Sequence, residues 1–319
     1  MTPETPRHNH PPGAERHLVE RLALRRIDRD IFTGWCHAGA PLRAFGGQVA
    51  AQALVAAGST VEDRERSVHS LHGYFLRPGR TTDHIVYIVD RPRDGRSYST
   101  RRVRAVQYGE TIFMMSASFA LHRPGPSHQK PPAVGADGGW MGSIPSPEDL
   151  NGEDILSRVD VGHPTDSAHR GSEMHDAGFP DRQLLELCFI DPAVVRRITP
   201  FGADQMTWVR SRETLPDGPL IHVCTVTYVS DLTLVETVLG PHGGSSQTQN
   251  LDKASIDHAM WFHAPFRADE WLLLVTDSPV ARDGRGFARG QFFKQDGILV
   301  ASVAQEALVR ERSTPRQSG

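Results

Sequence analysis

Cysteine is scarce in this sequence, with three residues among 319. Cys36, Cys188 and Cys224 lie far apart and form no C-x-x-C pair. An odd number of widely spaced cysteines argues against a disulfide framework. We therefore expect all three to be reduced and structural, as in a protein of the cytoplasm.

Long apolar runs and an excess of positive charge are also missing. No stretch approaches the length that a membrane-spanning helix needs, and the N-terminus lacks the apolar core of a signal peptide. The formal net charge is −3, so there is no basic field to attract nucleic acid or anionic lipid. We expect a cytoplasmic protein with no membrane span and no nucleic-acid partner.

The signatures of several enzyme classes are absent as well. The sequence contains no Walker-type or dinucleotide-binding fingerprint, and we expect no cofactor. It also lacks the Gly-x-Ser-x-Gly turn that carries the nucleophile of α/β serine hydrolases. Chemistry of that kind is therefore disfavoured.

What the sequence does contain is an internal duplication. The first stretch contains SVH (67–69), RDGR (93–96) and ASF (117–119), and the second contains SID (255–257), RDGR (282–285) and QEA (305–307). The offset is 188 residues between Ser67 and Ser255, and 189 between Asp94 and Asp283. A repeat at such long spacing predicts two copies of one domain rather than a solenoid.

Each copy shows the pattern of one helix and several strands. In the first copy, residues 45–57 are apolar on every side, which predicts a helix buried on every side. The expected strands are 70–76, 85–89, 101–107 and 112–119 in the first copy, and 184–189, 206–212, 256–262, 271–275, 286–293 and 298–308 in the second. We expect an α+β fold in which an antiparallel sheet wraps around a central helix. In the second copy we expect that helix to begin at Asp231, after an apolar run at 223–228.

The pattern predicts five segments along the chain. These are a disordered tail (1–15), a first domain (16–122), a linker that is partly disordered (123–180), a second domain (181–310) and a C-terminal tail (311–319). Within the linker, Ser146 followed by Pro147 predicts the start of a helix.

Three polar residues of the second copy stand out. Gln305 lies on a core-like strand, where its counterpart in the first copy is Ala117. Asp231 and Ser255 would add a carboxylate and a hydroxyl. Each has an ordinary structural explanation: a satisfied core amide, a helix N-cap and a turn hydroxyl. Together they would hold and deprotonate a water, which suits direct hydrolysis of an activated acyl group at one site per chain.

The motifs of both copies resemble one enzyme family. They are FGGQV (45–49), VHSLH (68–72), YFLRPG (74–79) and RDGRSY (93–98), then YVSD (228–231), SIDHAMWFH (255–263), RGFARG (285–290) and VAQE (303–306). In these motifs the chain is similar to acyl-CoA thioesterase II, the TesB type of double hotdog thioesterase. The resemblance covers about residues 17–122 and 183–310.

The resemblance implies a hotdog fold in each half, the double hotdog architecture, and a homodimer or higher homo-oligomer. It implies Asp231, Ser255 and Gln305 as catalytic residues around one water, with many relatives carrying Thr in place of the serine. The substrate would be a medium- to long-chain fatty acyl-CoA, which is hydrolysed to fatty acid and CoA.

Four further residues are candidates for substrate binding. Gly46 and Gly47, at a helix start, would offer backbone N–H groups to the oxyanion, although glycines for tight helix packing explain them equally well. Arg285 and Arg289 would contact the CoA phosphates, or would be solvated arginines on a strand.

Other functions remain open on the sequence alone. A metal site of Asp257, His258 and His263 is disfavoured, because the cluster lacks a helical pair of ligands four residues apart. Asp257 with His258 could instead serve an enoyl-CoA hydratase or dehydratase of the hotdog type. The third possibility is a non-catalytic acyl-CoA-binding protein.

Overall fold

The computed structural model describes residues 17–36, 43–130, 140–150, 184–199, 203–243 and 250–312. The predicted N-terminal tail, most of the predicted linker and most of the C-terminal tail lie outside these residues. At the predicted linker helix, Ser146 and Asp149 exchange backbone-to-side-chain hydrogen bonds of 3.1 and 3.2 Å. The continuation of that segment lies outside the described residues, and the domain boundaries stay predictions.

The first half is one antiparallel sheet around one helix. Its elements are α1 (Leu18–Leu22), β1 (Arg25–Asp28), β2 (Ile31–Gly34), α2 (Gly46–Gly58), β3 (Arg66–Phe75), β4 (Ile85–Asp94), β5 (Tyr98–Gln107) and β6 (Glu110–Leu121). The strands lie in the order β1-β2-β4-β5-β6-β3. Helix α2 is buried along almost its whole length. Its two glutamines, Gln48 and Gln52, both donate to the carbonyl groups of Arg21 and Trp35, which explains how they are tolerated in the core.

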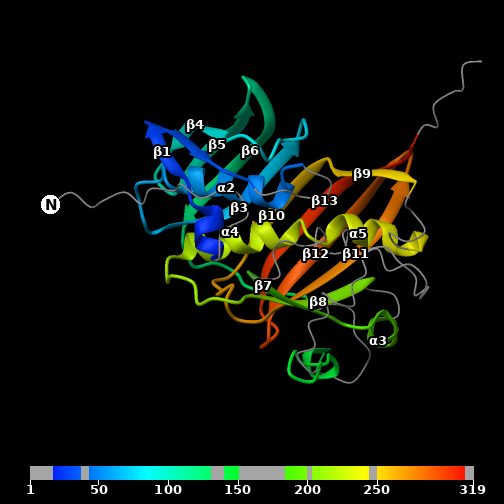
Figure 1. Cartoon of the computed structure of the whole chain (residues 1–319). Helices are drawn as coiled ribbons and strands as arrows, with labels where there is room; N and C mark the ends of the chain where they lie inside the picture. Colours follow the sequence, from blue (N-terminus) through cyan, green and yellow to red (C-terminus); the bar gives the residue numbers. More distant parts are fainter. Residues whose placement is uncertain are drawn as a thin grey trace, which may run out of the picture.

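The second half repeats this plan. Its elements are β7 (Leu185–Phe189), α3 (Pro192–Ile198), β8 (Gln205–Ser211), α4 (Pro219–Ser230), α5 (Leu234–Leu239), the 3-10 turn η4 (Gly240–His242), β9 (Leu251–Ser255), β10 (Asp257–Phe262), β11 (Leu272–Arg282), β12 (Arg285–Lys294) and β13 (Leu299–Glu311). The strands lie in the order β10-β13-β12-β11-β8-β7, and β9 also pairs with β13. The double hotdog prediction is confirmed, with α4 as the second central helix (Figure 1).

The predicted start of the second central helix is wrong. Asp231 does not begin a helix; it is the C-cap of α4, which begins at Pro219 after the N-cap Gly218. The apolar run 223–228, rich in valine and threonine, lies inside this helix. Thr225 and Thr227 donate to carbonyl groups four residues earlier, so their hydroxyls are satisfied in the core.

The expectation that no stretch is long enough to span a membrane also needs correction. The helical segment Pro219–His242 has 24 residues and is apolar enough to cross a bilayer by length and composition. However, 78% of its most apolar window is buried inside the protein, as in the core helix of a globular fold.

The two halves are joined by strand pairing and by helix packing. Strands β3 and β10 pair antiparallel, with Tyr74 opposite Asp257, so that the two sheets are continuous. Helices α2 and α4 run antiparallel and meet at both ends through glycine. A Cβ on Gly47 would lie 2.5 Å from the carbonyl oxygen of Tyr228, and one on Gly58 would lie 2.5 Å from Leu220. The halves are thus related by an approximate twofold axis, and the two helices make equivalent contacts at their two ends.

The described part of the predicted linker packs on the second half. The short helix η1 (Trp140–Ser143) and the residues after it contact a core cluster on β7, β8 and β11, and Trp208 donates to the carbonyl of Pro145 at 2.8 Å. Earlier in the linker, Gln129 bonds to the backbone of Gly297 and Leu299. Both stretches therefore contact the second half.

Candidate active site

Asp231 lies where α4 ends and α2 begins. It is 9% exposed and follows the last turn of α4. The backbone N–H of Gly47 donates to its carboxylate, and a Cβ on Gly46 would lie 2.6 Å from Oδ2. Because the N-cap residue of α2, Phe45, makes no side-chain cap, the carboxylate from the other half takes the place of an anion at this helix N-terminus.

Ser255 and Gln305 complete a hydrogen-bonded set with Asp231. Ser255 ends β9 and donates to Oδ1 of Asp231 at 2.9 Å. Gln305 points to the core face of β13, is 1% exposed, and donates from Nε2 to Ser255 Oγ at 2.9 Å. It also bonds to the Asp231 carboxylate. The structure therefore brings together the three residues that the sequence singled out, across separations of 24 and 50 residues.

The buried carboxylate has an altered acidity. Burial raises the pKa of Asp231 above its usual range, because a charge is costly away from water. The charge of His258 and the hydrogen bonds from Ser255, Gln305 and Gly47 lower this pKa in part. A carboxylate that binds a proton more tightly than usual is a stronger general base, provided that it is ionised at the working pH.

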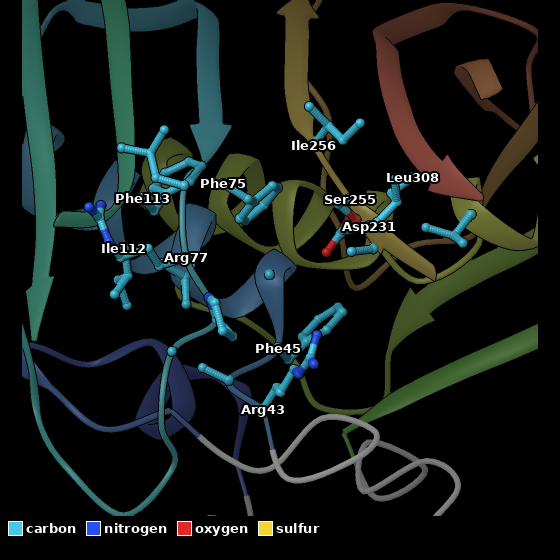
Figure 2. Close-up of a pocket in the computed structure, with 18 of the residues that line it drawn as sticks. Arg43, Phe45, Phe75, Arg77, Ile112, Phe113, Asp231, Ser255, Ile256 and Leu308 are labelled. Carbon is cyan, nitrogen blue, oxygen red and sulfur yellow. The ribbon is translucent and has the colours of Figure 1, made fainter. Parts of the chain in front are cut away.

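A pocket of about 590 Å³ opens beside Asp231 and Ser255. Its wall is largely apolar and includes Phe45, Val49, Phe75, Ile112, Phe113, Val235, Ile256 and Leu308. Arg43, Arg77 and Lys253 also line it. Figure 2 shows Asp231 and Ser255 next to each other, with Phe75 and Phe113 from the first half facing the same space. Both halves thus contribute walls, whereas the carboxylate and the hydroxyl come from the second.

The four residues predicted to bind substrate divide into two pairs. Gly46 and Gly47 contact Asp231 at the start of α2, and Gly46 lines the pocket. Arg285 and Arg289 do not line it; they lie exposed on β12, where Arg285 is 3.5 Å from Glu306 and Arg289 is 2.9 Å from Asp277.

Sequence reasoning singled out His258 for other roles and did not place it, or Ser230, next to this set. His258 is buried on β10, with Nδ1 2.6 Å from Oε1 of Gln305 and Nε2 2.8 Å from Oγ of Ser230. Ser230 is the last residue of α4. The alternation along β10, which puts His258 on the same face as the core residue Met260, was the available signal.

Asp257 and His258 do not form the pair that hydratase chemistry would need. They alternate on β10, and Asp257 accepts from the backbone N–H of Glu306 at 2.7 Å. His263 bonds to Ser302 instead. In the described part of the chain, no group of three or more His, Cys, Asp or Glu side chains could hold a metal ion.

The opposite end of the helix pair, in the first half, lacks the carboxylate and the amide. There α2 ends at Gly58, which packs against Leu220 at the start of α4. At the other end, Asp231 follows α4 and packs against the start of α2. Ala117 stands on β6 at the place that Gln305 has on β13, as the duplication predicts. The set therefore occurs once in the described residues.

A buried arginine lies at this opposite end, next to the C-terminus of α2. Arg101 is opposite Ala117 in the β5–β6 pairing and is 1% exposed. It donates to Thr60 Oγ1 at 2.8 Å, to the Thr60 carbonyl at 3.1 Å and to Asp94 Oδ1 at 2.8 Å. It also donates to the carbonyls of Arg93 and Thr100. A cation just beyond the C-terminus of α2 is favoured by the helix dipole.

Comparisons with known proteins agree with this architecture. The family model described as acyl-CoA thioesterase matches residues 188–308, and the model described as acyl-CoA thioesterase N-terminal domain matches residues 32–120. The chain is 36% identical to acyl-coenzyme A thioesterase 8 of Rattus norvegicus over 302 residues, which is 93% of this chain and 89% of the relative. It is 35% identical to acyl-CoA thioesterase 2 of Haemophilus influenzae, over 92% of this chain and 96% of the relative.

A solved structure extends the likeness to three dimensions. The acyl-CoA thioesterase II TesB2 from Mycobacterium marinum aligns with a TM-score of 0.73 and 38% identity, covering 92% of this chain and 98% of that chain. The similarity therefore includes both halves and their arrangement.

Proposed function

The chain belongs to the acyl-CoA thioesterase family, and from that premise we propose that it hydrolyses fatty acyl-CoA at Asp231, Ser255 and Gln305. That the protein is a thioester hydrolase follows from the family. The single observation that supports these three residues as the catalytic set is their hydrogen-bonded chain beside the pocket.

In the proposed mechanism a water molecule is the nucleophile. Ser255 and Gln305 hold the water against Asp231, whose carboxylate takes one proton as the oxygen attacks the thioester carbonyl. The tetrahedral intermediate collapses by breaking the C–S bond. The fatty acid and the CoA thiolate leave, and the proton on Asp231 passes to the thiolate or to solvent.

The start of α2 supports a second part of this mechanism. Gly47 donates its backbone N–H to the Asp231 carboxylate, which orients the base. We propose that the first-turn amides of α2, Gly46 included, stabilise the oxyanion when the substrate carbonyl enters.

The composition of the pocket supports the substrate class. Its apolar wall suits a medium- to long-chain acyl group, because each buried CH₂ contributes about 0.8 kcal/mol. Arg43, Arg77 and Lys253 line the same pocket, and we propose them for the CoA phosphates ahead of Arg285 and Arg289, which remain a prediction. A cytoplasmic location, supported by three buried cysteines that form no disulfide, and homodimerisation also remain predictions.

Release of the CoA thiol from an acyl-CoA series tests the proposal. The parent should release one thiol for each acid formed. Ser255→Thr should keep activity because the hydroxyl remains, whereas Ser255→Ala should lose roughly 10- to 100-fold, since a hydrogen bond to a charged group contributes about 1.5–3 kcal/mol. Hydration of an enoyl-CoA without thiol release, or tight binding without turnover, would point to the other two functions.

The pH dependence of the rate provides a second prediction. Because burial raises the pKa of Asp231, the base is lost to protonation at a higher pH than an ordinary carboxylate would be. The acid limb of kcat/KM should therefore have an apparent pKa above about 3.9, the usual value for aspartate. A pH profile that stays flat down to that value would argue against Asp231 as the base.

A further inference from the structure

A buried histidine connects the proposed catalytic amide to the end of α4. His258 is 1% exposed. Its Nδ1 lies 2.6 Å from Oε1 of Gln305, and its Nε2 lies 2.8 Å from Oγ of Ser230. Asp231 and Ser255 line the pocket, whereas His258 reaches them through Gln305. The hydrogen-bonded route from His258 to Ser255 therefore runs through that amide.

The two ends of the Gln305 amide have different chemistry but nearly the same shape. The nitrogen end donates two hydrogen bonds, and the oxygen end only accepts. Ser255 and Asp231 receive bonds from the nitrogen end. If the amide were reversed, its oxygen would face the Asp231 carboxylate, and the set would lose the donors that bond to Ser255 and Asp231. The orientation of this amide is therefore critical for the site.

The contact with His258 selects one orientation. Because the amide oxygen of Gln305 can only accept, Nδ1 of His258 must donate the proton at 2.6 Å. On the other side of the ring, Oγ of Ser230 lies 2.8 Å from Nε2 and 2.9 Å from the carbonyl oxygen of Thr227. When the single hydroxyl proton of Ser230 points to Nε2, that nitrogen accepts and the proton of a neutral ring is on Nδ1. The ring is thus tied to the last turn of α4, one residue before Asp231.

We infer that His258 is a positioning residue for the hydrolysis, which directs the nitrogen of Gln305 toward Ser255 and Asp231 by donating from Nδ1 to the amide oxygen. Ser230 holds the ring in that orientation. The inference rests on the proposed function, because it assumes that Gln305 acts on the water beside Asp231.

Two substitutions of His258 separate positioning from simple packing. The amide nitrogen of asparagine can take the place of Nδ1, whereas that of glutamine takes the place of Nε2. His258→Asn should therefore keep most of the parent kcat. His258→Gln should lower kcat by roughly 10- to 100-fold, since a displacement of about 1 Å at a reacting group can cost about 100-fold. KM should change little in both, because His258 does not touch the substrate.

Three comparisons make the outcome decisive. His222→Asn alters another buried histidine, which accepts from the backbone of Ala268 and lies outside the catalytic set; its kcat should match the parent. Equal kcat losses in His258→Asn and His258→Gln, or a larger loss in His258→Asn, would overturn the inference. If Asp231→Asn strongly lowers kcat while His258→Gln keeps the parent kcat, only the role of His258 fails. If Asp231→Asn keeps the parent kcat, the proposed function itself fails.

Discussion

Replacement of Asp231 by asparagine is expected to lower kcat for acyl-CoA hydrolysis by roughly 10²- to 10⁴-fold, the contribution of a positioned general base. Asparagine has almost the same shape and its amide oxygen can still accept from Ser255, so the pocket should remain formed. What it cannot do is take a proton from water. The measurement is thiol release over a range of substrate concentrations, and KM should change far less than kcat.

The neighbouring carboxylate Asp257 provides the matched control. It accepts from the backbone of Glu306 and lies on the opposite face of β10 from His258. Asp257→Asn should therefore keep a kcat near that of the parent. A large loss in Asp257→Asn with normal turnover in Asp231→Asn would contradict the assignment of the base and would favour the hydratase-like pair.

Thermal unfolding of Asp231→Asn should show that the carboxylate is kept at a cost. The folded chain binds the Asp231 proton more tightly than the unfolded chain does, because burial raises the pKa. The charged form thus destabilises the fold at a pH above both pKa values, and this cost disappears below the unfolded value. The difference in Tm, variant minus parent, should be more positive near pH 8 than near pH 4.

The sequence predicts the parts of this fold whose signals are local. Residues 45–57 are apolar on every side, and the structure has α2 at Gly46–Gly58. The residues of α4 carry an equally apolar pattern but are rich in β-branched residues, which fit a buried strand as well as a buried helix. The proline at its first position, Pro219, was the local sign of a helix start.

The candidate site is predictable only where a motif marks it. Asp231, Ser255 and Gln305 stand in motifs, and the structure brings them together. The contact of His258 with Gln305 joins residues 47 positions apart and depends on strand register. Likewise, nothing local indicates that Asp231 meets the N-terminus of α2, since that contact arises from the antiparallel packing of the two central helices.

The buried arginine at the C-terminus of α2 leads to a prediction about stability. Arg101 replaces the catalytic set there with a buried cation that bonds to Thr60 and Asp94. Arg101→Ala is expected to lower the free energy of unfolding by about 3–5 kcal/mol, because it leaves a cavity and buried oxygens without a donor. Asp94 is half exposed and remains solvated, so most of this loss comes from the unpaired oxygens of Thr60 and from the cavity.

The adjacent arginine makes the comparison specific. Arg102 is 55% exposed and pairs with Asp90 on the surface, so Arg102→Ala should cost about 0–1 kcal/mol. Arg101→Lys should fall between the two, because lysine keeps the charge but not the planar set of donors. Denaturant unfolding measures all three, and a loss in Arg101→Ala no larger than in Arg102→Ala would contradict the prediction. Turnover per folded molecule should stay at the parent value in each, because Arg101 lies next to the C-terminus of α2 and Asp231 lies at its N-terminus.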